Sequence, residues 1–225
     1  MSDLLIEAHD LGRTYLQGGI PVPALVSASF CIRKKDRIAI IGSSGSGKST
    51  LLHLMAALDT PSTGQLAWPA LGTPEQLLPN KIALAFQSPS LLAPLTVAEN
   101  VALPLIMGNG EQDIDAAVSA ALRTFELTSL ADKLPEELSG GQMQRVALAR
   151  AIAGNPSLIL ADEPTGQLDQ PTGRAVLDAL LMHLEGTDTA LVISTHDPAV
   201  ADRMGQVWRM QHGVLSTTEG QEVSS

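Results

Sequence analysis

The sequence predicts an α/β fold with a mainly parallel sheet, an N-terminal antiparallel β subdomain and an inserted α-helical subdomain. Three observations indicate this fold class. Short β-branched apolar runs alternate with segments of helical period, the start of the chain is rich in strand-forming residues around a Gly-Gly turn, and one central stretch is helical without strands. The chain has 225 residues, of which 44% are hydrophobic, so we expect a single domain over residues 1–225 with a sizeable core.

The first elements are expected in the order strand, strand, strand, helix. Residues up to Phe30 are expected to form antiparallel strands around the turn at Gly18 and Gly19. Residues 37–41 form a compact apolar strand that runs into glycine-rich sequence. Apolar residues then recur at helical spacing, at Leu51, Leu54, Met55 and Leu58. The sequence Asp-Thr-Pro at 59–61 is expected to stop this helix.

A helical insert is expected from about residue 89 to residue 154, between a strand that ends near Phe86 and the next strand at 158–161. Within it, residues 112–127 place apolar side chains on one helical face, namely Ile114, Ala117, Val118, Ala121, Leu122 and Phe125. Another buried strand is expected at 189–194. The polar end of the chain, from about 216 to 225, is expected to fray.

Composition excludes several classes of function. The net charge of −10 argues against a protein that holds nucleic acid through a broad positive field, so we expect no nucleic-acid partner. One cysteine, Cys31, can supply neither an internal disulfide nor a multi-thiolate zinc site. We expect no signal peptide, because the first ten residues contain acidic residues and no basic region before an apolar stretch. We expect no direct membrane insertion, because apolar runs fall far short of roughly 18 residues. Any work at a membrane would require a partner.

A phosphate-binding loop follows the strand at 37–41. The motif G-x-x-x-x-G-K-[ST] is met by Gly42, Ser43, Ser44, Gly45, Ser46, Gly47, Lys48, Ser49 and Thr50. Backbone N–H groups and the following helix N-terminus favour phosphate oxygens, Lys48 adds a full positive charge, and Ser49 offers a hydroxyl to Mg²⁺. The strand before and the helix after the motif indicate a P-loop NTPase core.

A second glycine-rich helix start lies at Leu138-Ser139-Gly140-Gly141-Gln142. Ser139 and Gln142 have the spacing of a capping box for a helix over 142–153, which Gly154 ends. A well-capped structural helix is the simpler interpretation, but capping does not require two consecutive glycines. The pattern therefore indicates a second anion site.

Adjacent carboxylates end the apolar strand at 158–161. Asp162 and Glu163 lie where parallel sheets place ligands, and successive strand residues point in opposite directions, so the two acids are expected to differ in role. Without the phosphate loop, a solvated turn would be the better interpretation of this pair.

The sequence LSGGQ at 138–142 is similar to the signature of the ATP-binding-cassette ATPases, and the resemblance covers Tyr15 to about Leu215. In that family two protomers enclose two ATP molecules, with the signature of one facing the phosphate loop of the other. The resemblance implies a homodimer in which Ser139, Gly140 and Gly141 contact the γ-phosphate held by the partner subunit. It implies ATP and Mg²⁺ as cofactors and ATP hydrolysis as the reaction.

The resemblance also implies roles for single residues. Asp162 would organise Mg²⁺, and Glu163 would orient or deprotonate the attacking water. Gln87 would reach Mg²⁺ and the water, and His196 would contact the γ-phosphate. Asp169 lies in a loop that would couple the two sites across the dimer. Tyr15, the only tyrosine, would stack on adenine, although packing within a β-hairpin is the alternative for it.

Within the family, residues 42–54, 58–61 and 162–166 resemble the lipoprotein-release, macrolide-export and cell-division branch. This implies an ATPase subunit on the cytoplasmic face of the inner membrane that drives a separate permease, in export or mechanotransmission. Apolar residues within 88–100 would dock the permease or pack into the insert, namely Leu91, Leu92, Leu95 and Val97. The alternative function is a regulatory ATPase that activates cell-envelope machinery without moving a substrate. Gln167, where the branch usually has Asn, and the short segment 64–87 depart from the pattern.

Overall fold

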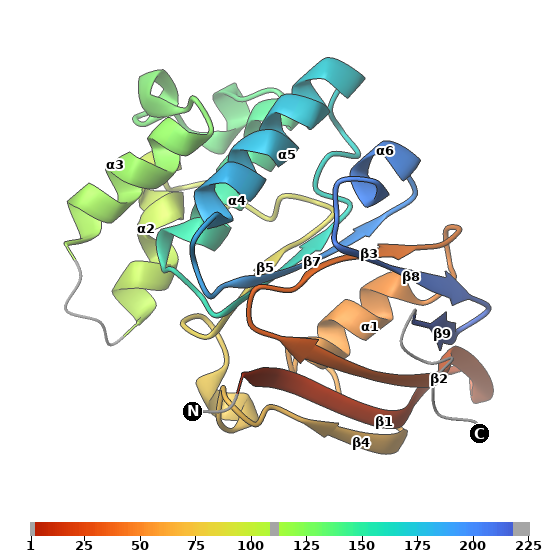
Figure 1. Ribbon diagram of the computed structural model, residues 1–225. Coiled ribbons are helices and arrows are strands. Elements are labelled where there is room, and N and C mark those ends of the chain that lie inside the picture. The colour runs from red at the N-terminus through yellow and green to blue at the C-terminus, as the bar shows by residue number, and fades with distance from the viewer. Residues whose placement is uncertain (1–2, 109–112, 218–225) are drawn as a thin grey trace. The chain divides into compact units, whose positions relative to one another are not determined.

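The computed structural model describes residues 3–108 and 113–217 (Figure 1). The chain divides into two compact units, one formed by Met1–Leu77 with Ala190–Ser225 and the other by Leu78–Thr189. The helical insert predicted at 89–154 falls inside the second unit. The polar end predicted to fray lies, from residue 218 on, outside the described residues.

A long antiparallel hairpin opens the first unit. Strands β1 (Leu4–Gln17) and β2 (Ile20–Arg33) pair along their length, and the turn between them has Gly18 and Gly19 at φ of 58° and 85°. Such positive φ values suit glycine, which has no Cβ to clash. The predicted hairpin is confirmed, although β2 continues three residues beyond Phe30. Strand β4 (Thr63–Ala67) pairs antiparallel with the other edge of β1.

Parallel strands form the other half of this sheet. Strand β3 (Arg37–Ile41) lies between β7 (Ala190–Thr195) and β8 (Gln206–Gln211) and is parallel to both. Strand β9 (Val214–Ser216) connects β8 to β2, so the order within the unit is β4-β1-β2-β9-β8-β3-β7. The side chains of Ile38 and Ile40 are fully buried, as a central strand of β-branched residues requires. Helix α6 (Pro198–Ala201) follows β7.

Helix α1 (Lys48–Met55) follows β3 and is shorter than the sequence predicts. Ala57 has φ of 53°, and the N–H of Leu58 bonds to the carbonyl oxygen of His53, so the chain has already left the helix before the Asp-Thr-Pro sequence. Leu58 is 49% exposed, although its spacing suggested a core position. The expectation that the helix continues to residues 59–61 is therefore wrong, because an αL residue ends it earlier.

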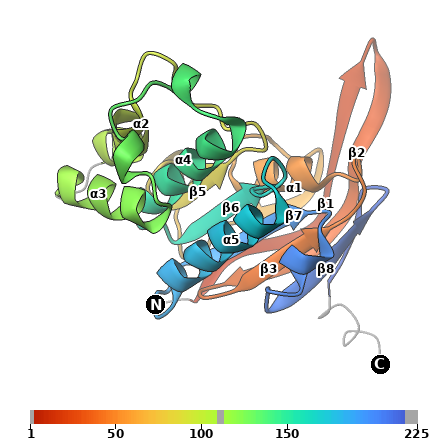
Figure 2. The same ribbon diagram turned by 90° about the horizontal axis from the view of Figure 1, so that it is seen from above.

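The second unit contains one strand pair and the longer helices. Strands β5 (Ile82–Ala85) and β6 (Leu158–Asp162) are parallel. Helices α2 (Val97–Met107), α3 (Ile114–Thr124) and α4 (Gly140–Ala153) pack on one another, as Figure 2 shows, and α5 (Gln170–Leu184) follows β6. Short 3₁₀ turns occur at Pro74–Gln76, in the first unit, and at Thr128–Leu130 and Pro135–Glu137.

The predicted amphipathic helix at 112–127 corresponds to α3. Asp113 caps its start by accepting from the N–H of Ala116, and residue 112 lies outside the described residues. The helix ends before residue 127 because Glu126 has φ of 56°. Four of the six apolar positions are buried, namely Val118, Ala121, Leu122 and Phe125. In the ranges 3–108 and 113–217, no helix combines the length and the apolar character needed to cross a membrane.

Candidate functional site

The phosphate loop lies between β3 and α1, as predicted. Gly45 and Gly47 have φ of 76° and 108°. A Cβ on Gly47 would collide with the carbonyl oxygen of Ala24 in β2, so both backbone angle and space require glycine here. The loop is thus folded tightly against the antiparallel hairpin.

Two buried polar side chains give this loop the chemistry of an anion site. The Nζ of Lys48, a residue only 6% exposed, donates to the carbonyl oxygens of Gly42 (2.8 Å) and Ser43 (3.1 Å). The Oγ of Ser46 is buried and has no hydrogen-bond partner among the described residues. Ser49, at the start of α1, is exposed. A cation, a buried hydroxyl without a partner and an open hydroxyl fit a phosphate chain with a bound Mg²⁺.

His196 emerges at the same edge of the sheet as the phosphate loop. Ile41 in β3 is paired with Thr195 in β7, so Gly42 and His196 directly follow neighbouring ends of two parallel strands. His196 is exposed. The next residue, Asp197, is fixed because its N–H donates to Thr195 Oγ1 (3.0 Å) and its carboxylate accepts from the N–H of Ala199 (2.8 Å). The first unit therefore brings His196 to the edge that carries the loop.

Tyr15 lies in β1 and is held by two residues that the sequence analysis missed as site residues. Its hydroxyl donates to Asp59 Oδ2 (2.7 Å), and the guanidinium carbon of Arg13 lies 4.7 Å from the centre of its ring. Asp59 follows α1 and was interpreted only as a helix stop. The contact between positions 15 and 59 spans 44 residues. No local sequence pattern could reveal it.

Gln87 and the paired carboxylates come together in the second unit. Ala85 in β5 is paired with Ala161 in β6, so Gln87 and Glu163 each lie two residues beyond a matched position. Asp162 is 7% exposed, whereas Gln87 is exposed and Glu163 half-buried. The two acids thus differ in environment, as predicted, but the cause is not strand alternation, because β6 ends at Asp162 and Glu163 has left the strand.

The backbone at Glu163 is strained. Its φ of 45° is uncommon for a residue with a Cβ, and the carbonyl oxygen of Glu163 accepts from the N–H of Gly166 (3.0 Å). Gly166 thus lies next to Glu163, and a Cβ on Gly166 would make an ordinary contact, at 3.5 Å, with Glu163 Oε2. Strained backbone of this kind persists where surrounding contacts hold it, and it is frequent at catalytic positions.

The signature segment starts α4. The capping box is confirmed: Ser139 Oγ accepts from the N–H of Gln142 (3.2 Å), and Gln142 Oε1 accepts from the N–H of Ser139 (2.8 Å). The helix begins at Gly140, two residues earlier than predicted.

The two glycines of the signature also have a packing role inside the chain. A Cβ on Gly140 would lie 3.2 Å from Gln167 Oε1, and one on Gly141 would lie 2.7 Å from Leu168 Cδ2. Small residues let the loop after β6 approach the first turn of α4. Gln167, which departs from the pattern of the related branch, is one of the two residues that make this approach.

Asp169 caps helix α5. Its carboxylate accepts from the N–H of Thr172 (3.0 Å) and from Thr172 Oγ1 (2.8 Å). These bonds, the backbone one first, lower the pKa of Asp169. The carboxylate is therefore ionised at neutral pH and fixes the end of the loop that contains Gln167 and Leu168.

The segment after Gln87 is held by two further residues that the sequence analysis did not identify. Arg150, near the end of α4, donates to the carbonyl oxygens of Pro89 (3.2 Å) and Ser90 (3.2 Å) and to Ser90 Oγ (3.3 Å). Desolvation by burial lowers the pKa of this guanidinium, which still stays charged.

Asn100 holds the next part of the same segment. It is fully buried; its Oδ1 accepts from the N–H of Leu92 (2.8 Å), and its Nδ2 donates to the carbonyl oxygens of Leu92 (3.1 Å), Leu95 (3.0 Å) and Thr96 (3.0 Å). Among the apolar residues of the segment, Leu92 is 49% exposed and Val97 is fully buried. Val97 thus joins the core, as one of the two expectations has it, and Leu92 faces outward; docking of a permease stays a prediction.

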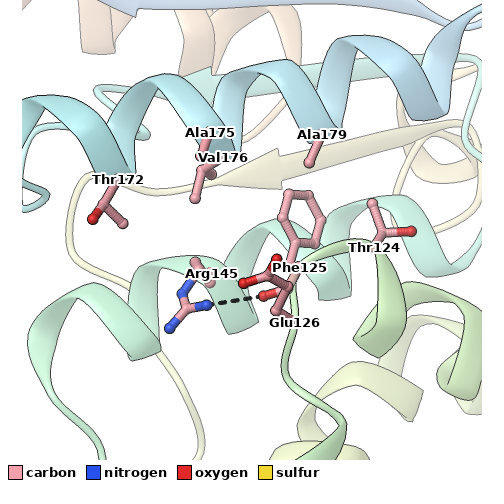
Figure 3. Close-up of a pocket in the computed structure, with 8 residues that line it drawn as sticks. All are labelled: Thr124, Phe125, Glu126, Arg145, Thr172, Ala175, Val176 and Ala179. Carbon is pink, nitrogen blue, oxygen red and sulfur yellow. Dashed lines mark hydrogen bonds between the residues drawn. The ribbon is translucent and has the colours of Figure 1, made fainter.

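A shallow pocket also occurs in the second unit, between the end of α3 and helices α4 and α5 (Figure 3). Arg145 in α4 donates to the carbonyl oxygen of Phe125 (3.1 Å), and its Nε is buried and has no partner within 3–108 and 113–217. The pocket is lined by Thr124, Phe125, Glu126, Arg145, Thr172, Ala175, Val176 and Ala179. None of these residues belongs to the predicted site.

Comparisons with known proteins agree with this geometry. Residues 25–166 match the family model described as ABC transporter. The lipoprotein-releasing system ATP-binding protein LolD of Legionella pneumophila strain Lens is 39% identical over 227 residues, which cover 97% of this chain and 100% of that protein. The same protein of strain Paris is 39% identical over 229 residues, with the same coverage.

Solved structures of MJ0796 are also similar to this chain. A dimeric post-hydrolysis state bound to ADP and Pi has a TM-score of 0.86, and a dimer described as a bacterial ABC transporter cassette has a TM-score of 0.85. Each is 34% identical, and the match covers 95% of this chain and 98% of the other. The predicted α/β fold class, with antiparallel and parallel strands in a P-loop NTPase core, is confirmed.

Proposed function

Because this chain belongs to the ABC transporter family and is an ATPase that uses ATP and Mg²⁺, we propose that it drives a separate membrane permease in an export or mechanotransmission system. The observation that carries the proposal is the phosphate loop, because the burial of Lys48 and of Ser46 Oγ there supports a site for anions. The relatives of the lipoprotein-releasing system support this branch of the family. The chain would act at the cytoplasmic face of the inner membrane, as one domain with a helical insert at about 89–154.

The residues of the first unit would bind the nucleotide. Lys48 would exchange its bonds to Gly42 and Ser43 for phosphate oxygens, which is favourable because hydrogen bonds to charged groups are the stronger ones. The backbone of residues 42–47 and the N-terminus of α1 would hold the same phosphates, and Thr50 follows in the first turn of that helix. Tyr15 would stack on the base.

Hydrolysis would use the remaining predicted site residues. Ser49, Gln87 and Asp162 would hold Mg²⁺, whose charge offsets that of the phosphates. Glu163 would orient the attacking water or accept a proton from it. The strained backbone at Glu163 sets the direction in which its side chain leaves the chain. His196 would hold the γ-phosphate and position the water. A second copy of the chain would supply Ser139, Gly140, Gly141 and Gln142, and Asp169 would couple the two sites.

Two substitutions test this mechanism. Lys48→Ala removes the buried charge and should weaken ATP binding roughly 10- to 100-fold in calorimetry. Glu163→Gln should leave ATP binding intact, lower turnover about 10²- to 10⁴-fold and give an ATP-dependent dimer in size-exclusion chromatography. A Glu163→Gln variant that hydrolyses at the parent rate would remove this residue from the mechanism.

The partner is tested by capture. The Glu163→Gln chain, loaded with ATP and Mg²⁺, is isolated from detergent-solubilised membranes of its own source, and the double variant Lys48→Ala/Glu163→Gln is the matched control. We expect a permease with few spans and a large extracytoplasmic domain, retained only by the single variant. A many-span importer permease would contradict the branch, and a dimer without any membrane protein would contradict the permease partner.

A further inference from the structure

Arg13, Tyr15 and Asp59 form a closed triad in the first unit, in which each side chain contacts the other two. The Nε and one terminal nitrogen of Arg13 bond to the two carboxylate oxygens of Asp59, at 3.0 and 2.7 Å. Tyr15 donates its hydroxyl to the same carboxylate at 2.7 Å, and the guanidinium lies over its ring at 4.7 Å. Two-point pairing of Arg with a carboxylate fixes orientation as well as distance.

The ion pair of the triad, between Arg13 and Asp59, is mostly shielded from water. The side chains of Arg13 and Asp59 are 25% and 18% exposed. Burial by itself raises the pKa of Asp59, but the hydrogen bonds from Tyr15 and from the N–H of Thr60, together with the charge of Arg13, hold it below its ordinary value. A charged carboxylate therefore anchors the hydroxyl end of Tyr15 at neutral pH.

The strand register places Tyr15 near the phosphate loop. Tyr15 is paired with Val22, which lies two residues along β2 from Ala24, the residue whose carbonyl contacts Gly47. Two residues of a strand span about 7 Å. A nucleotide whose phosphates lie on the loop could thus extend its base toward the ring of Tyr15.

We propose that Arg13 and Asp59 are positioning residues for the nucleobase, which fix the ring of Tyr15 so that the base stacks on the face opposite Arg13. The inference rests on the proposed role of Tyr15. The guanidinium occupies one face, so the base must use the other, and a cation on the first face draws electron density from the ring and favours an electron-rich purine on the second. An anchored ring also loses less rotational freedom when the base binds.

The test compares ATP with inorganic tripolyphosphate, which carries the phosphates without the base. Dissociation constants of both are measured by calorimetry on the full chain with Mg²⁺. Tyr15→Leu should weaken ATP binding about 5- to 150-fold, which is the range for base stacking on an aromatic ring. Asp59→Ala, Arg13→Ala and Tyr15→Phe should each weaken it about three- to tenfold, roughly the net contribution of one ordinary hydrogen bond. Tripolyphosphate binding should not change.

The comparison also separates a positioning role from a structural one. In the Tyr15→Leu background, Asp59→Ala should cause no further loss of ATP affinity, because Asp59 acts through the tyrosine. Glu7→Ala, which removes an exposed carboxylate from the same strand, is the control and should bind both compounds as the parent does. If Asp59→Ala folds poorly, Tyr15→Phe tests the same contact, because it removes the hydroxyl that bonds to Asp59 and keeps the ring.

Three results would overturn the proposal. Equal losses for ATP and tripolyphosphate in Asp59→Ala would make Asp59 a support of the phosphate loop. A loss in Tyr15→Leu with none in Arg13→Ala, Asp59→Ala and Tyr15→Phe would leave Tyr15 as a stacking residue that needs no positioning. Unchanged ATP binding in Tyr15→Leu would remove the tyrosine from the nucleotide site, whereas the ATPase assignment itself is decided by Lys48→Ala.

Discussion

Asn100 gives the sharpest test of how the segment after Gln87 is built. Replacing Asn100 with Asp keeps the size of the side chain and the acceptor for the N–H of Leu92. The substitution replaces the amide nitrogen, which donates to three carbonyl oxygens, with a carboxylate oxygen, which can only accept. Because residue 100 is fully buried, the three carbonyls would face a carboxyl group that cannot reach water.

The expected cost follows from these bonds. The amide has two hydrogens, so one of them is shared between two of the three carbonyl oxygens. At about 1 kcal/mol for each lost hydrogen bond, and more for buried groups left without a partner, the loss is about 2–3 kcal/mol. Asn100→Ala also loses the bond from the N–H of Leu92, so it should cost about 1 kcal/mol more, or about 3–4 kcal/mol. Both values are a large share of the stability of an ordinary domain.

The assay has two readouts. Urea unfolding gives the free energy of unfolding of each variant, and amide hydrogen exchange reports the protection of the N–H of Leu92. Asn100→Asp should retain that protection better than Asn100→Ala, since only the former keeps the Oδ1 acceptor. Glu99→Ala is the control, because Glu99 belongs to the exposed capping box at the start of α2. Midpoints for Asn100→Ala equal to that of the control, with Leu92 still protected, would refute the reasoning.

Two further predictions concern the first unit. Gly47→Ala places a Cβ against the Ala24 carbonyl at a φ of 108°, so it should lower the free energy of unfolding by about 1–3 kcal/mol and abolish ATP binding. Gly18→Ala, at a φ of 58° in open space, is the control and should destabilise the protein without affecting ATP binding. Equal ATP binding by both variants would count against the loop geometry. The pKa of Asp59 is lowered in the folded protein, so the charged carboxylate contributes stability above its unfolded pKa, and this stability is lost as the pH falls through the folded value. The parent should therefore lose more stability than Asp59→Asn when the pH is lowered below about 4. Parallel pH profiles of the urea midpoints of the two proteins would disprove this.

Local motifs predicted the fold and the phosphate loop because their physical cause is local. Residues 37–50 hold a strand, a turn of small residues and a helix start, and the structure places them as expected. The capping box of α4 is local in the same way, since Ser139 and Gln142 are three residues apart.

Contacts between distant positions could not be predicted from the sequence alone. Asp59 resembled a helix stop because only its neighbours are visible in the sequence, whereas its partners Arg13 and Tyr15 lie 46 and 44 residues away. Arg150 and Ser90 are 60 residues apart. The end of α1 was misjudged for another reason: Ala57 adopts an αL backbone that its side chain gives no reason to expect.

The contacts of Arg150 connect the segment after Gln87 to the last turn of α4. The helix has 14 residues and is therefore about 20 Å long, with the signature glycines in its first turn and Arg150 in its last. Arg150 donates to the backbone two and three residues beyond Gln87, and the exposed Leu92 follows shortly after in the sequence. One helix therefore links, through direct contacts, the segment after Gln87 at its last turn and the residues Gln167 and Leu168 at its first turn.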